Sequence, residues 1–114
     1  MNFKKTVFLV AISGFLFASC ESDNLPALDP KGVYENGLLI ANEGAFSGGT
    51  GTVNFISDDY LTEESEIFNQ VNGESIGTIL QSIGFNNDDA YLIANVGNKI
   101  TVADRFTMEK ITEI

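Results

Sequence analysis

Short runs of alternating apolar and polar residues make up most of the chain after residue 36. The later half predicts four strands, at residues 79–85, 90–95, 99–103 and 110–114. Turn-forming residues separate the first three, at Asn86–Asp89 and at Val96–Asn98. The second strand is nearly all apolar, which predicts packing on both faces. The third alternates Ile100 and Val102 against Thr101, a pattern typical of an outer strand with one polar face.

The tetrapeptide Leu-Ile-Ala-Asn occurs twice, at 39–42 and at 92–95. Each copy is followed by the same series: a glycine-containing loop, an alternating strand, a polar turn and a final extended segment. In the first unit we expect the alternating strand at 52–56 and the final extended segment at 64–68. The alternative for the final segment is a single helical turn within residues 61–70. Repeats of about fifty residues built from short strands are typical of propeller blades. We therefore predict an all-β fold of four-stranded antiparallel β-propeller blades, about two of them in an incomplete ring.

The first 19 residues have the composition of an export signal. Lys4 and Lys5 precede an apolar run, Val7–Phe17, that is too short to span a bilayer. The sequence Leu-Phe-Ala-Ser-Cys that ends at Cys20 resembles a bacterial lipobox, although Phe17 occupies the place where leucine is usual. The resemblance implies a helical lipoprotein signal peptide (1–19) and lipidation of Cys20. An ordinary secretory signal before an unpaired cysteine is the alternative.

A polar segment with both prolines of the chain follows, and we predict a tether over residues 20–32 and folded blades over 33–114. Sixteen acidic residues outnumber six basic ones, for a formal net charge of −10. Phosphate backbones repel such a chain, so nucleic acid is not expected as a partner, and the lipid must hold the protein at the membrane.

Candidate catalytic chemistry is sparse. Histidine is absent, and Cys20 is the only cysteine. After its acylation neither a Ser-His-Asp or Cys-His site nor a zinc site can form within the chain. No phosphate-binding glycine motif is present either. We predict no enzyme activity, no cofactor and no metal site.

Residues 90–114 (AYLIANVGNKITVADRFTMEKITEI) resemble the YVTN/YncE-like β-propeller repeat, in which an apolar strand ending in Asn is followed by a Gly/Asn turn and a strand ending in Asp. Residues 37–57 (GLLIANEGAFSGGTGTVNFIS) resemble the N-terminal end of such propellers in Bacteroidetes surface lipoproteins. Acidic residues directly after Cys20 are similar to the surface-export signal of those lipoproteins. Because family members usually have seven blades, the resemblance implies that 33–114 is a partial domain, an N-terminal fragment of a longer protein. A small protein that assembles into a ring is the alternative.

The resemblance also implies a function: a lipid-anchored binding or scaffold module at the cell surface, with the periplasmic side of the outer membrane left open as its location. Its expected partners are a small-molecule ligand or an outer-membrane transporter, since similar surface lipoproteins include vitamin B12 capture proteins. The alternative is the N-terminal part of a propeller enzyme, a quinoprotein-like oxidoreductase or a lactonase, with catalytic residues beyond residue 114.

The candidate binding site is the loop Glu43–Gly51, which has nine residues where the second unit has three. It is rich in glycine and carries one carboxylate, Glu43, and one aromatic ring, Phe46, that could stack on a flat ligand. The alternative is a tolerated insertion with Phe46 packed against the blade. The acidic run 58–66 offers many oxygen ligands, but its spacing does not match a calcium-binding loop, so a solvated edge is expected there.

Overall fold

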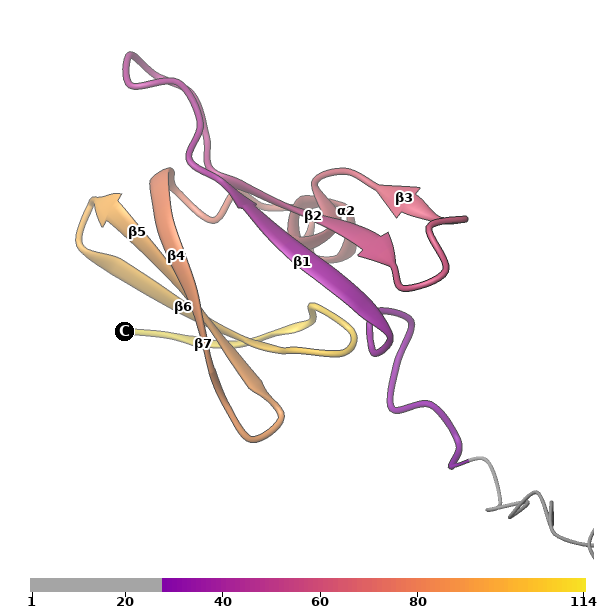
Figure 1. Cartoon of the computed structure of the whole chain (residues 1–114). Helices are drawn as coiled ribbons and strands as arrows, with labels where there is room; N and C mark the ends of the chain where they lie inside the picture. Colours follow the sequence, from indigo (N-terminus) through magenta and orange to yellow (C-terminus); the bar gives the residue numbers. More distant parts are fainter. Residues whose placement is uncertain (1–27) are drawn as a thin grey trace, which may run out of the picture.

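A computed structural model describes residues 28–114. The predicted signal peptide (1–19), Cys20 and the start of the tether lie outside the described residues. The described part folds into two antiparallel sheets and one short helix (Figure 1). This confirms the prediction of an all-β fold.

The first sheet has the order β1-β2-β3, formed by β1 (Gly37–Asn42), β2 (Thr52–Ser57) and β3 (Glu63–Glu64). The helix α2 (Ile67–Asn72) follows, so the prediction of an extended segment at 64–68 is wrong beyond Glu64, and the helical alternative is correct. Ile67 and Phe68 are adjacent in sequence and both fully buried. Successive residues of a strand point to opposite faces, whereas a helical turn lets both side chains pack on one core.

The second sheet has the order β4-β5-β6-β7. Its strands are β4 (Thr78–Asn86), β5 (Asp89–Val96), β6 (Lys99–Asp104) and β7 (Lys110–Glu113). The predicted strands agree with these bounds to within one residue at each end. Positive φ angles at Asn87, Gly97 and Asn98 explain why asparagine and glycine occupy the two hairpin turns.

The core lies between the two sheets and includes side chains from α2. Its central members are Val53, Phe55, Ile67, Phe68, Leu80, Ala90, Leu92, Ala103 and Met108. Thr101 is 0 % exposed, so its predicted place on an outer polar face is wrong. It pairs with Leu92 and therefore shares the face that meets the first sheet. Along β5 only the alternate residues Ala90, Leu92 and Ala94 are fully buried, so close packing is confirmed for one face of that strand.

The two sheets repeat the same strand pairing. The pairing of β1 with β2 matches the pairing of β5 with β6 residue by residue. Gly37↔Ser57 in the first sheet corresponds to Asp89↔Asp104 in the second. In the same way, Leu39↔Phe55 corresponds to Tyr91↔Val102, and Asn42↔Thr52 to Ala94↔Lys99. The residue after each second strand donates its N–H to the carbonyl just before the first, at 3.1 Å from Asp58 to Asn36 and 2.9 Å from Arg105 to Asp88. Leu39 is thus the structural equivalent of Tyr91, whereas the repeated tetrapeptide aligns it with Leu92.

A shift of one residue places a side chain on the opposite face of a sheet. We call the face that carries Leu39 in the first sheet and Tyr91 in the second the front face, and the opposite one the back face. Val53 and Phe55, on the front of the first sheet, share a core with Ala90 and Leu92, on the back of the second. The two repeats therefore stack front to back, in the same orientation.

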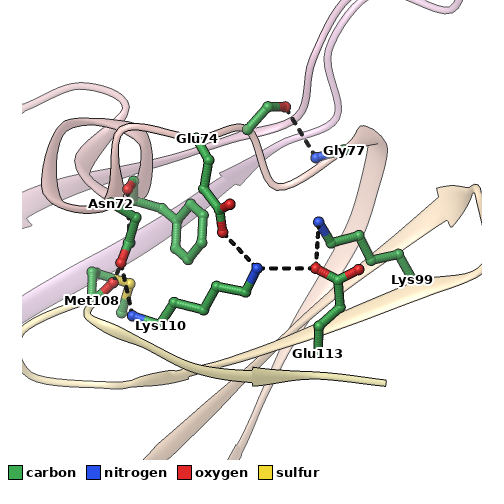
Figure 2. Close-up of polar contacts among 9 residues, drawn as sticks. Asn72, Glu74, Gly77, Lys99, Met108, Lys110 and Glu113 are labelled. Atoms are coloured by element: carbon green, nitrogen blue, oxygen red, sulfur yellow. Dashed lines mark hydrogen bonds and ion pairs between the residues drawn. The ribbon is translucent and has the colours of Figure 1, made fainter.

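Polar contacts also join the two repeats (Figure 2). The Asn72 side chain at the end of α2 donates to the Met108 carbonyl at 2.7 Å and accepts from the Lys110 N–H at 2.8 Å. Lys110 Nζ lies 2.6 Å from Glu74 Oε1 and 3.1 Å from Glu113 Oε2, which in turn lies 2.7 Å from Lys99 Nζ. These ion pairs raise the pKa of Lys110 and lower that of Glu113. The linker after α2 is thereby held against the β6–β7 edge.

Candidate functional site

The candidate loop, Glu43–Gly51, connects β1 to β2 and extends beyond both sheets (Figure 1). Its base is anchored to the start of β4. The Leu80 N–H donates to the Glu43 carbonyl at 3.2 Å, and the Gly51 N–H donates to the Gly77 carbonyl at 2.8 Å. Gly51 is required by this close approach, because a Cβ there would lie 2.4 Å from the Leu80 Cβ. The loop is therefore attached to both sheets.

The tip of the loop is a turn in which the Gly49 N–H donates to the Ala45 carbonyl at 3.0 Å. Gly44 and Gly48 have φ angles of 85° and 95°, which side-chain-bearing residues rarely adopt. Between them Phe46 is 89 % exposed. The alternative interpretation, with Phe46 packed against the sheet, is thus wrong. Glu43 is also exposed, so the loop presents both predicted site residues to solvent.

The β5–β6 turn lies at the same end of the molecule. Thr78 at the start of β4 pairs with Thr50 of the loop and with Val96 at the end of β5. A shallow depression of about 260 Å³ lies beside this turn. Its lining residues are Gln81, Ile93, Ala94, Asn95, Asn98, Lys99 and Ile100. Sequence reasoning missed the carboxamides in this group, because Asn98 follows a glycine, as in an ordinary hairpin turn, and because only the strand pairing brings Gln81 of β4 beside the end of β5.

The acidic segment 58–66 consists of the β2–β3 turn, strand β3 and the residues that lead into α2. Asp59 Oδ1 accepts hydrogen bonds from the Ser57 hydroxyl at 2.6 Å and from the Leu61 N–H at 3.0 Å, and these bonds lower the pKa of Asp59. Glu64 accepts a bond from the Tyr34 hydroxyl at 3.2 Å. Burial, reinforced by the Glu64 carboxylate, raises the pKa of Tyr34. Within residues 28–114 no group of three or more His, Cys, Asp or Glu side chains could hold a metal ion.

Cys20, the predicted lipidation site, lies outside the described residues. No helix in the described part of the chain is long and apolar enough to cross a membrane.

Comparison with curated proteins found no match. Residues 36–114 match the family described as a domain of unknown function, DUF5074. The matched region begins directly before β1 and includes both sheets and the candidate loop. The chain therefore belongs to the DUF5074 family.

Proposed function

We propose that this chain is a non-enzymatic binding or scaffold module of β-propeller type, held at the outer membrane by a lipid on Cys20. The main observation that supports a binding role is the position of Phe46. An 89 % exposed aromatic ring stands at the tip of a loop whose base is hydrogen-bonded to β4. Exposed aromatic anchors on loops that a rigid scaffold positions are typical of recognition surfaces.

Two features support the propeller assignment. The sheets are four- and three-stranded meanders with sequential strand order, as in propeller blades. The front face of the first sheet also packs on the back face of the second, so the two repeats have the same orientation along an array. The resemblance to YncE-like surface lipoproteins of Bacteroidetes points the same way, and it suggests cell-surface capture of a ligand for an outer-membrane transporter.

The loop end offers suitable chemistry for a flat ligand with polar edges. Phe46 supplies a stacking surface and Glu43 a hydrogen-bond acceptor, while Asn95 and Asn98 at the neighbouring turn supply both donors and acceptors. Because the chain is strongly acidic, a neutral or cationic ligand suits this surface better than an anion.

Cyanocobalamin is the first probe, since the resemblance includes vitamin B12 capture proteins. In a calorimetric titration we expect the intact protein to bind it, and Phe46→Ala to weaken binding about ten- to a hundredfold, the typical effect of losing an aromatic anchor. Leu61→Ala, an 85 % exposed side chain in the β2–β3 turn, is the matched control and should leave the affinity unchanged. Equal affinity for Phe46→Ala and the unsubstituted chain would remove the loop from the site. Absence of binding by the unsubstituted chain would refute corrinoid capture.

The scaffold form of the proposal is tested separately in cells. A photo-crosslinking amino acid at position 46 should give a covalent product with a membrane protein that co-purifies with the chain in the dark. The same probe at position 61 should not. Equal labelling from both positions would show that position 46 has no specific partner.

A further inference from the structure

Asparagine directly before glycine occurs twice in the chain, at Asn36–Gly37 and at Asn72–Gly73. Such a step is prone to spontaneous deamidation. The backbone nitrogen of the glycine attacks the side-chain amide carbon of the asparagine and ammonia leaves; the cyclic imide then takes up water and opens to aspartate or isoaspartate. Glycine favours this attack because it has no Cβ to obstruct the approach. The reaction needs a free side-chain amide and a free glycine nitrogen, so the fold decides which step reacts.

Both reacting groups are free at the first step, which lies directly before and at the start of β1. The Asn36 side chain is exposed and forms no hydrogen bond within residues 28–114. The Asp58 N–H donates to the Asn36 carbonyl at 3.1 Å. Gly37↔Ser57, the next pair along the strands, is therefore a non-hydrogen-bonded pair. The Gly37 N–H points away from β2 as a result and takes no part in the pairing of the two strands.

Both reacting groups are occupied at the second step, at the end of α2 (Figure 2). The Asn72 side-chain nitrogen donates to two backbone carbonyls, at 2.9 Å and 2.7 Å, and its oxygen accepts from the Lys110 N–H at 2.8 Å. The Gly73 N–H donates to the Asn69 carbonyl at 2.9 Å. Each hydrogen bond that must first break lowers the reactive population roughly two- to tenfold, so these bonds should slow the reaction about tenfold or more.

We propose that Asn36 is a deamidation site of the folded protein, and that the contacts between the two repeats protect Asn72. Water is the only co-reactant and ammonia the only leaving group, so the modification needs no enzyme. It is independent of any ligand at the Glu43–Gly51 loop.

The modification changes the start of β1. Either product adds a carboxylate between Glu35 in the sequence and Asp58 across the sheet, and isoaspartate also adds one methylene group to the main chain. Gly37 has little room to adjust, because even a Cβ there would lie 2.5 Å from the Phe55 ring. The Asp58 N–H therefore loses a well-placed acceptor, and its hydrogen exchange should be faster in the deamidated protein.

Peptide mapping of the full chain, incubated in detergent at neutral pH, tests the proposal. A protease that cleaves after glutamate releases peptides 36–43 and 67–74, each with one Asn-Gly step. Mass spectrometry detects the exchange of NH₂ for OH, and enzymatic methylation detects isoaspartate. In the folded chain we expect peptide 36–43 to react about tenfold faster than 67–74, or more. In concentrated urea the two rates should become similar, because only the shared Asn-Gly sequence then matters.

Two controls lie within the same peptide. Asn42 precedes glutamate and not glycine, so fragment spectra should place the modification at Asn36 alone. Asn36→Gln should abolish the modification of peptide 36–43 and leave that of 67–74 unchanged; circular dichroism should show it folded, because the side chain is exposed. Equal rates for the two peptides in the folded chain would overturn the proposal. So would a reaction at Asn36 that is fast only in urea, since the fold would then protect this step as well.

Discussion

Phe46 and Phe68 are both aromatic residues of the first repeat, but their surroundings differ completely. Phe46 is 89 % exposed at the loop tip, and Phe68 is fully buried between α2 and the sheets. We expect Phe46→Ala to change the free energy of unfolding by less than about 0.5 kcal/mol. Phe68→Ala should cost about 3–5 kcal/mol, because it leaves a cavity in the core. Denaturant unfolding of the two variants measures the difference; a large loss for Phe46→Ala would mean that the ring packs.

Gly51 and Gly84 provide a second matched pair. A Cβ at Gly51 would lie 2.4 Å from the Leu80 Cβ, whereas one at Gly84 would have Tyr91 Cβ as its nearest neighbour at 3.9 Å. Gly51→Ala should therefore destabilise the protein by about 1–3 kcal/mol through overpacking. Gly84→Ala should be tolerated. Thermal melts of both variants check this, and equal midpoints would contradict the close approach of the loop base to β4.

The ionised side chain of Asp59 stabilises the β2–β3 turn. Its pKa is lowered by bonds from Ser57 and Leu61 that favour the carboxylate. A group with a lowered pKa in the folded state stabilises the protein above its unfolded pKa, and this contribution is lost as the pH falls through the folded value. Between about pH 5 and pH 2 the melting temperature should thus fall more steeply for the unsubstituted chain than for Asp59→Asn. Parallel curves would show that the turn is insensitive to this charge.

At the scale of elements, α2 is the connection that holds the two repeats together. Its last residue, Asn72, bonds to Met108 and Lys110 of the second repeat and to the Phe68 carbonyl at 2.9 Å. Because the helix has six residues, too few for stability in isolation, such tertiary bonds and the burial of Ile67 and Phe68 must maintain it.

Asn72→Ala should cost about 1–3 kcal/mol, since the Met108 carbonyl and the Lys110 N–H lose their partner in a half-buried site. Gln70→Ala is the control in the same helix and should cost much less, because the Gln70 side chain is exposed and donates to the Ser65 carbonyl within the same segment. Hydrogen exchange at the Lys110 amide is the specific measurement, because it should accelerate in Asn72→Ala alone. Unchanged exchange there would mean that the amide has another acceptor.

At the scale of the whole molecule, the two stacked sheets follow a segment with the pattern of an export signal and a lipobox ending at Cys20. We expect Cys20→Ser to abolish membrane retention, because Cys20 is the proposed lipid carrier and anionic head groups repel so acidic a chain. Cell fractionation with immunoblotting measures it. Unchanged membrane association and processing in Cys20→Ser would refute lipidation.

Local patterns were enough to predict most strands and the candidate loop. Alternation and turn residues place β4 to β7 to within one residue, because both act over a few neighbouring positions. The length and glycine content of Glu43–Gly51 likewise mark a loop from sequence alone. The same patterns predicted Phe46 as a site residue but left its packing open, since exposure depends on what lies beside the loop in space.

Three features depended on the tertiary structure: the helix at Ile67, the burial of Thr101 and the true alignment of the repeat. Each follows from contacts between residues distant in sequence. Ile67 and Phe68 form a helical turn because β2 and the second sheet offer one shared core. Thr101 is buried because its face of β6 meets the first sheet. The repeated tetrapeptide is misaligned by one residue because strand pairing, which sets the face of each side chain, depends on hydrogen bonds across the sheet and not on local identity.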